Sequence, residues 1–275
     1  MLFTFLISLV AGKVYFQETF NMNWNSGWVQ SYSQRYGQFI SSPGNWYADI
    51  SDLGIKTLDF STNYAISSSF PSFSTSTKPL IIQYTLKNEN VIDCAGGYIK
   101  ILSSDINQRK FSGKTPYLIM FGPDICNGEA KGHLIIPYKG ENYSIKTPLR
   151  IINDQYTHQY TLVINPDDTF EYYLDNEFEI SGKIRESFDM PEDYDDNAHI
   201  IENIGVVGIE VLQATPGSVF DNFIIGDDIG EIREFSKNTF VYRVGKEKKA
   251  KKKYDDQQEE VRRQAVGNED LLKYL

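Results

Sequence analysis

Short runs of β-branched and aromatic residues, separated by clusters of Gly, Asn, Asp and Pro, make up most of the chain before Glu231. Such side chains pack well on a pleated surface and turn residues end each run, so the pattern is typical of strands. We expect strands at 14–16, 64–67, 80–87, 91–92, 98–102, 117–121, 133–138, 160–164, 170–174, 204–212 and 219–225. Because few stretches follow the helical period, the pattern predicts a mostly β body built as a sandwich.

Four turn sequences suggest how these strands connect. Asn165-Pro166-Asp167-Asp168 and the pair Asp175-Asn176 are typical of hairpin turns. Thr215-Pro216-Gly217 lies between the last two strands, which we therefore expect to pair with each other. Gly122-Pro123-Asp124 is expected to be a turn that directs a carboxylate back toward the strand ends.

The pattern changes from about Glu231 onward. Residues 246–264 contain helix formers and mixed charge without Gly or Pro, which predicts a helix. Its first part, KEKKAKKK at 246–253, carries six Lys and one Glu. Positive charge at a helix start opposes the helix dipole, so the first turns are expected to fray. The helix is either a solvated tail or a segment attracted to an anionic surface or to the acidic body.

Composition narrows the functional classes. The 275 residues carry a formal net charge of −10, and because the basic run opposes it, the rest of the chain is more acidic still. An acidic body argues against nucleic acid as the main partner and is compatible with Ca²⁺. Residues 1–12, MLFTFLISLVAG, are too short to span a bilayer and predict a secretory signal, the alternative being a buried first strand. No other stretch is apolar enough for a membrane span.

Two motifs lie at the centre of the sequence, DCAGGYIK at 93–100 and YLIMFGPDIC at 117–126. At this spacing they resemble the paired signature of the calreticulin/calnexin family of endoplasmic reticulum lectin chaperones. Further similar blocks are VYFQETF at 14–20, GNWYADI at 44–50, THQYTL at 157–162, NPDDTFE at 165–171, GVVGIEV at 205–211 and FDNFII at 220–225. The resemblance implies an all-β, concanavalin-like jelly-roll sandwich of a concave and a convex antiparallel sheet, with a C-terminal α-helix lying against it.

The resemblance also implies a division of the chain. Residues 1–12 would be a signal peptide, 13–245 the lectin domain, and 246–275 a charged helix and tail. The family carries a proline-rich arm that recruits a thiol-disulfide isomerase. Here only 183–202 is available as a short remnant, with PEDYDD at 191–196 similar to one stub of an arm repeat, so we expect no recruitment of an isomerase. The family's polyacidic, calcium-storing tail and its KDEL-type signal are not seen in this sequence.

A carbohydrate site needs paired hydrogen-bonding groups, an aromatic or apolar face and rigid support. Tyr98 and Lys100 are two apart on an expected strand and so share a face, although alternation alone would make them ordinary surface positions. Asp124 can accept from a pair of hydroxyls. The resemblance implies a glucose-binding groove lined by Tyr98, Lys100, Tyr117, Met120, Asp124, Ile135 and Glu210.

Some positions depart from the simple expectation. Tyr117 and Met120 are three apart, which puts them on opposite faces of a regular strand, so a bulge or a bend toward Gly122 is needed. Glu210 stands where the family has Asp, and Leu212 where it has Trp. Leucine can neither stack on a sugar ring nor donate a hydrogen bond, so we expect weakened sugar binding.

The resemblance implies a structural Ca²⁺ site as well. A hard cation prefers oxygen ligands, many of them backbone carbonyls. Asp221 in the FDN motif corresponds to the carboxylate ligand of the family, the alternative being a turn residue that bonds nearby amides. The carbonyl ligands would come from Thr19, Ser51 and Leu53.

The cysteine count predicts one covalent cross-link. A secreted chain whose two cysteines are Cys94 and Cys126 is expected to join them in a disulfide. Two buried free thiols are the alternative.

The function that the resemblance implies is a calcium-binding lectin chaperone of the endoplasmic reticulum lumen that recognises monoglucosylated high-mannose N-glycans on folding glycoproteins. Secretion or a place at the cell surface remains open because no KDEL-type signal is seen. The alternative is a calcium-bound protein that binds unfolded polypeptide, or a surface interaction protein, that has lost sugar recognition.

An enzyme is not expected. Asp175, Glu177 and Glu179 alternate on one face, as the acid and nucleophile of jelly-roll glycosidases do, but the turn at Asp175 is expected to leave them in solvent. No serine or cysteine nucleophile constellation is visible. His133 and His158 lie in strand patterns and are expected to be ordinary core histidines.

Overall fold

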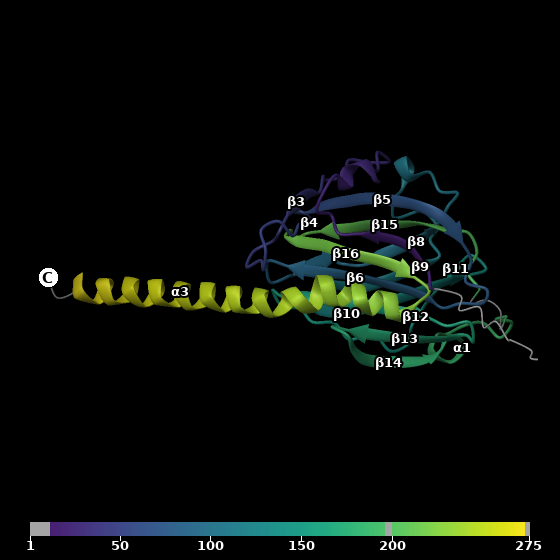
Figure 1. The fold of residues 1–275 in the computed structure, drawn as a ribbon. Helices are drawn as coiled ribbons and strands as arrows, with labels where there is room; N and C mark the ends of the chain where they lie inside the picture. Colours follow the sequence, from purple (N-terminus) through teal and green to yellow (C-terminus); the bar gives the residue numbers. More distant parts are fainter. Residues whose placement is uncertain (1–11, 196–199, 273–275) are drawn as a thin grey trace, which may run out of the picture.

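The computed structural model describes residues 12–195 and 200–272 as a sandwich of two antiparallel sheets (Figure 1). The first sheet has the strand order β14-β13-β12-β6-β16-β4-β3, with β1 added beside β16. Its strands are β1 (Val14–Glu18), β3 (Ile40–Ser42), β4 (Gly54–Lys56), β6 (Leu80–Asn88), β12 (Thr157–Ile164), β13 (Thr169–Leu174), β14 (Glu177–Lys183) and β16 (Ser218–Gly226). The expected all-β sandwich is confirmed.

The second sheet has the order β11-β10-β9-β7-β15-β5-β2, and β8 also pairs with both β15 and β9. Its strands are β2 (Trp28–Gln30), β5 (Thr62–Phe73), β7 (Cys94–Gly96), β8 (Ile99–Ser103), β9 (Ile119–Cys126), β10 (Glu129–Tyr138), β11 (Glu141–Ser144) and β15 (Ile204–Gln213). Single turns of helix lie in the loops: η1 (Trp24–Ser26), η2 (Gln108–Lys110) and α1 (Ile184–Ser187).

The hydrophobic core between the sheets is rich in aromatic rings. Tyr84 of β6 lies edge-on to Phe121 of β9 at 6.1 Å and close to Phe223 of β16 at 5.4 Å, measured between ring centroids. All three side chains are buried. Strand β6 is buried along its whole length, so its outer face must be covered as well.

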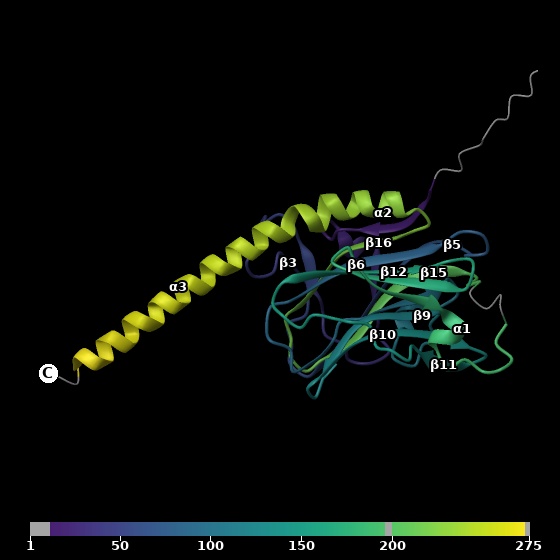
Figure 2. The same cartoon turned by 90° about the horizontal axis from the view of Figure 1, so that it is seen from below.

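The cover on the outer face of the first sheet is the C-terminal helix, made of α2 (Ile229–Ser236), the π-helical turn η3 (Lys237–Val241) and α3 (Tyr242–Leu272). Ile232 of α2 packs on Ile81 of β6 in a small apolar cluster. Figure 2 shows α2 lying along the sheet and α3 running on beyond the body of the sandwich. In the described part of the chain, no helix is long and apolar enough to cross a membrane.

This helix begins earlier than the expected residue 246. The Asp228 carboxylate caps it by accepting from the amides of Gly230 at 2.7 Å and Glu231 at 3.2 Å. The basic run therefore lies within a continuous helix, and the expectation of fraying at its first turns is wrong. The helix is also only partly solvated, because Glu247 and Lys251 are buried against the body.

Three other expectations about local structure are wrong. Gly122-Pro123-Asp124 is no turn but part of β9, which Gly122 allows by adopting a φ of 126°. Residues 215–217 connect β15 in the second sheet to β16 in the first, so these strands do not pair. Val91 and Ile92 lie outside any strand, and Ile92 instead packs in a small cluster beside β7.

The turn at Asp175-Asn176 is confirmed, since both residues have positive φ as a two-residue hairpin turn requires. Asp175 is not free in solvent, however. Its carboxylate contacts His158 Nδ1 at 2.8 Å, and Asp154 contacts His158 Nε2 at 2.9 Å. Burial disfavours charge on this imidazole, but the two carboxylates outweigh it and raise the pKa of His158 to about 9. His158 is thus the satisfied core histidine that the sequence predicts.

The remnant segment packs closely on the body. Tyr194 is buried, its ring lies 5.0 Å from that of Tyr138, and its hydroxyl donates to Asp168 Oδ1 at 2.8 Å. The expected signal sequence at 1–12 lies almost wholly outside the described residues, as does 196–199 within the remnant. The division of the chain into domains thus stays a prediction.

Candidate functional site

A row of residues crosses four strands of the second sheet on its outer face. The register aligns Gly208 of β15 with Lys100 of β8, Lys100 with Met120 of β9, and Met120 with Ile135 of β10. Neighbours of these residues along each strand, such as Ile99 and Phe121, point into the core and are fully buried. Lys100, Met120 and Ile135 therefore share the outer face.

Lys100 is the polar centre of this row. Its ammonium lies 2.7 Å from Glu210 Oε2, two residues beyond Gly208 on β15. The same ammonium lies 5.5 Å from the centroid of the Tyr117 ring, within the range of a cation–π contact. Lys100 and Glu210 are both largely buried. An ammonium has three donors, so this pairing with Glu210 leaves Lys100 able to donate further.

A second polar group lies beside it, formed by Tyr98, Asp124 and His133. Asp124 Oδ2 is 3.1 Å from His133 Nε2, and the His133 ring meets that of Tyr98 edge-on at 6.1 Å. Burial raises the pKa of Tyr98, and the nearby charges of Glu210 and Asp124 raise it further, so its hydroxyl stays a donor. Acceptor and donor groups thus lie close to one another on this face of the sheet.

His133 is the residue that sequence reasoning missed here. It was expected in the core, but it alternates with buried Leu134 and lies half-buried on the outer face. Its spacing of two from Ile135 was the available signal, because residues two apart on a strand share a face.

The conflict between Tyr117 and Met120 has a simple resolution. Strand β9 begins at Ile119, so Tyr117 precedes the strand and is not bound by its alternation. The loop before it packs on the outer face of the sheet through Phe111, which lies directly over Gly208. This loop thus covers the outer face of the sheet at Gly208, next to Lys100.

Cys94 and Cys126 form a disulfide, as the sequence predicts. The two residues are directly paired in the register of β7 and β9. Asp124 is two residues from Cys126 and is itself paired with Gly96. The cross-link therefore fixes the strand pair that presents the Asp124 carboxylate.

Segments that carry the expected calcium ligands lie near one another at the first sheet, on the other side of the sandwich. A Cβ atom added to Gly54 would lie 3.1 Å from Asp221 Cβ, so the 51–54 segment passes directly beside Asp221. Asn21 Oδ1 accepts from the Leu53 amide at 2.7 Å, which ties the segment after Thr19 to the same place. The structure thus gathers the three segments, while Ser51 itself lies on an exposed turn.

The chemistry of this region fits a cation. Burial raises the pKa of Asp221 well above its usual range, and the Asp52 carboxylate raises it further. The neighbouring Asn222 Oδ1 is a buried acceptor without a hydrogen-bond partner. Among the described residues, no three His, Cys, Asp or Glu side chains are grouped to hold a metal ion. A calcium ion here would therefore depend on backbone carbonyls for most of its ligands.

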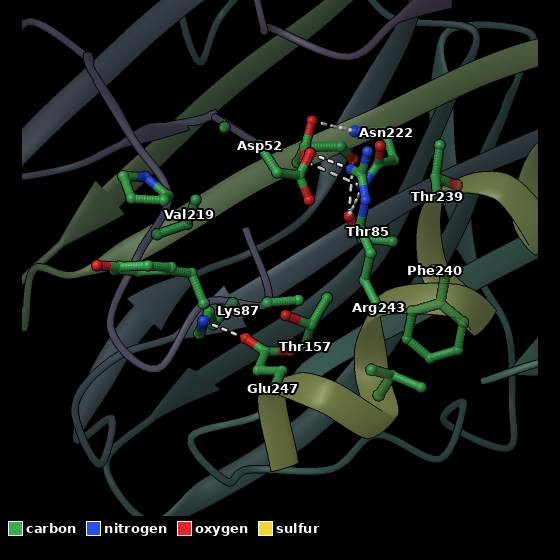
Figure 3. A pocket seen from close by; sticks show the side chains of 16 residues that line it. Asp52, Thr85, Lys87, Thr157, Val219, Asn222, Thr239, Phe240, Arg243 and Glu247 are labelled. Carbon is green, nitrogen blue, oxygen red and sulfur yellow. Dashed lines mark hydrogen bonds and ion pairs between the residues drawn. The ribbon is translucent and has the colours of Figure 1, made fainter. Parts of the chain in front are cut away.

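A small cavity of about 50 Å³ lies next to Asp221, between the first sheet and the start of α3 (Figure 3). The guanidinium of Arg243 forms an ion pair with Asp52 inside it. Glu247, one turn further along α3, forms an ion pair with Lys87 of β6. Figure 3 shows each helix residue pointing at its partner on the body. Sequence reasoning predicted neither pair.

Comparison with known proteins shows extensive similarity. The Calreticulin family matches at residues 16–193. Calreticulin of Dictyostelium discoideum is 29% identical over 346 aligned positions, covering 89% of this chain and 82% of the relative. Calreticulin of Drosophila melanogaster is 40% identical over 212, covering 70% of this chain and 52% of the relative, so this chain spans about half of that protein. The solved T. cruzi calreticulin globular domain has a TM-score of 0.84 and 32% identity, covering 89% of this chain and all of that domain.

Proposed function

This chain belongs to the calreticulin family of lectin chaperones, and from that premise we propose that it is a calcium-binding lectin that recognises monoglucosylated high-mannose N-glycans on folding glycoproteins. The observation that carries the proposal is the outer row of the second sheet. Tyr98, Lys100 and Asp124 supply donors and an acceptor beside the apolar surfaces of Met120 and Ile135. Vicinal sugar hydroxyls require such paired groups, and the C–H side of the ring requires such a surface.

The replacement of the family's Trp by Leu212 determines the affinity that we expect for sugar. Leu212 is 44% exposed on β15, two residues from Glu210, and offers no stacking surface and no donor. An aromatic stacking contact and one hydrogen bond are together worth about 1–3 kcal/mol, or about 5- to 150-fold in affinity. We expect weak binding of glucose-capped oligomannose, strengthened by Leu212→Trp and abolished by Asp124→Ala, as measured by isothermal titration.

The matched control for Asp124→Ala is Asp256→Ala, which removes a carboxylate from the exposed surface of α3. It should leave glycan binding unchanged. Should the wild type bind no glycan and Leu212→Trp restore none, the sugar-binding proposal would be abandoned.

The competing proposal is a calcium-bound polypeptide-binding protein that has lost sugar recognition. The contact that favours it is the 2.7 Å pair of Lys100 with Glu210, because it already occupies one of the three donors of Lys100 and an oxygen of Glu210 that a sugar would need. A protein of this kind would suppress aggregation of an unfolded, unglycosylated client, and Lys100→Met would leave that effect intact.

The calcium part of the proposal predicts a stability effect through Asp221. A ligand that binds only the folded state adds about 2.7 kcal/mol to the free energy of unfolding at a hundredfold excess over its dissociation constant. We expect Ca²⁺ to raise the melting temperature of the wild type, and Asp221→Ala to abolish the rise. Asp189→Ala, which removes an exposed carboxylate near α1, should keep it. An equal rise in both variants would reject the assignment of Asp221.

The remaining parts of the proposal follow from the family. Calreticulins are chaperones without enzymatic activity, and two of the three alternate carboxylates suggested as a catalytic set have structural partners here, since Asp175 contacts His158 and Glu179 pairs with Arg150. We propose action in the endoplasmic reticulum lumen on glycoprotein clients. Recruitment of a disulfide isomerase through an arm is not expected, because the described part of 183–202 packs on the body.

A further inference from the structure

The first turns of α3 are held to the body by two ion pairs of opposite sense. Arg243 and Glu247 are four residues apart and therefore lie on one side of the helix. Arg243 meets Asp52, and Glu247 meets Lys87, whose ammonium also donates to the Asn45 carbonyl. All four side chains are mostly buried, at 27% exposure or less. The helix thus presents the cation of Arg243 to an anion of the body and the anion of Glu247 to a cation of the body.

The cation of this pair lies at the proposed calcium site. Asp52 stands between Ser51 and Leu53, whose carbonyls are proposed ligands, and Arg243 and Asp221 line the same cavity. Figure 3 shows the Arg243 guanidinium entering from the helix side and facing Asp52 next to Asn222. Two neighbouring carboxylates that would otherwise repel each other are therefore already neutralised in part by a cation of the protein itself.

We propose that Arg243 competes with Ca²⁺ for this carboxylate site, so that calcium binding and docking of the start of α3 oppose each other. The inference rests on the calcium part of the proposed function and adds a regulatory contact to the same site. A divalent ion beside the guanidinium is repelled by it, and it also weakens the attraction of Asp52 for Arg243. Such coupling is reciprocal. The free energy by which the docked Arg243 weakens calcium binding therefore equals the free energy by which bound calcium weakens docking of the helix.

The test compares calcium affinity in two variants that each remove one positive charge from α3. Arg243→Gln removes the guanidinium at the site, while Arg263→Gln removes an exposed one that pairs with Glu259 of the same helix. By isothermal titration with CaCl₂, we expect Arg243→Gln to bind calcium at least about tenfold more tightly than the wild type. Arg263→Gln should match the wild type.

Hydrogen exchange of the amides at 242–251 gives a readout that is independent of affinity. In the wild type, added calcium should speed exchange there. In Arg243→Gln, exchange should be fast already and respond little to calcium. Retention of slow exchange in the core strands, such as β6, shows that the variant is folded.

The outcomes separate this inference from the proposed function. Equal calcium affinity in Arg243→Gln and Arg263→Gln, or an α3 that does not respond to calcium in the wild type, rejects the competition and leaves the calcium site standing. Absence of calcium binding in the wild type and in both variants rejects the calcium site and the competition together. Calcium binding that is detected in Arg243→Gln but in neither the wild type nor Arg263→Gln supports the competition, and would mean that Arg243 blocks the site completely.

Discussion

Replacement of Gly122 by alanine is expected to lower the free energy of unfolding by about 3–5 kcal/mol, near the upper end for a single substitution. A Cβ atom at this position would lie 1.9 Å from the hydroxyl of Tyr84, which is fully buried and donates to the Gly97 carbonyl at 2.7 Å. The substitution must therefore displace an aromatic side chain from the core and break its hydrogen bond. Gly122 also has a φ of 126°, which alanine adopts only with strain. Urea unfolding measures the loss.

Gly128→Ala is the matched control. Gly128 also has a positive φ, of 81°, but a Cβ atom there would meet nothing within 4 Å. Its cost should be limited to backbone strain, about 1–2 kcal/mol. Equal losses in the two variants would show that the contact with Tyr84 is not the cause.

Removal of the disulfide should have the second largest effect. Cys94 and Cys126 are 32 residues apart, and the chain-entropy model assigns about 3–4 kcal/mol to closing a loop of this length. We expect the double variant Cys94→Ala/Cys126→Ala to lose this amount in urea unfolding. Its glycan affinity should fall as well, because β7 and β9 present Asp124 next to the cross-link.

A reducing agent provides the control for this prediction. Dithiothreitol should lower the stability of the wild type toward that of the double variant and leave the double variant unchanged. A double variant as stable as the oxidised wild type would contradict the prediction, and would mean that strand pairing alone fixes β7 against β9.

Two long strands could be predicted almost completely because branched and aromatic residues fill both of their faces, whereas only 64–67 of the longest strand, β5, was expected. Strands such as β6 and β15 were found at nearly their full length. Short edge strands such as β3, with its sequence ISS, were missed because one apolar residue followed by two serines gives no hydrophobic alternation. The pairing of strands was harder still, since residues 215–217 look like a hairpin turn but cross between the sheets.

The candidate sugar site could be predicted only through the family resemblance. Alternation alone puts Tyr98 and Lys100 on one face, but it does not show which exposed face of a sheet is used. His133 could have been found from its spacing to Ile135. The contact of Arg243 with Asp52 could not, because it joins residues 191 apart and depends on where a helix lies on a sheet.

The strand connection at 215–217 has a consequence for how the two proposed sites are used together. It carries the chain from the strand of Glu210 in one layer to the strand of Asp221 in the other, so the two proposed sites lie on different sheets of the sandwich. A glycoprotein resting on the second sheet would not cover the cation site. Calcium could then bind and dissociate while a client stays bound. The dissociation rate of the client would therefore not limit how quickly the calcium occupancy of the protein responds to a change in calcium concentration.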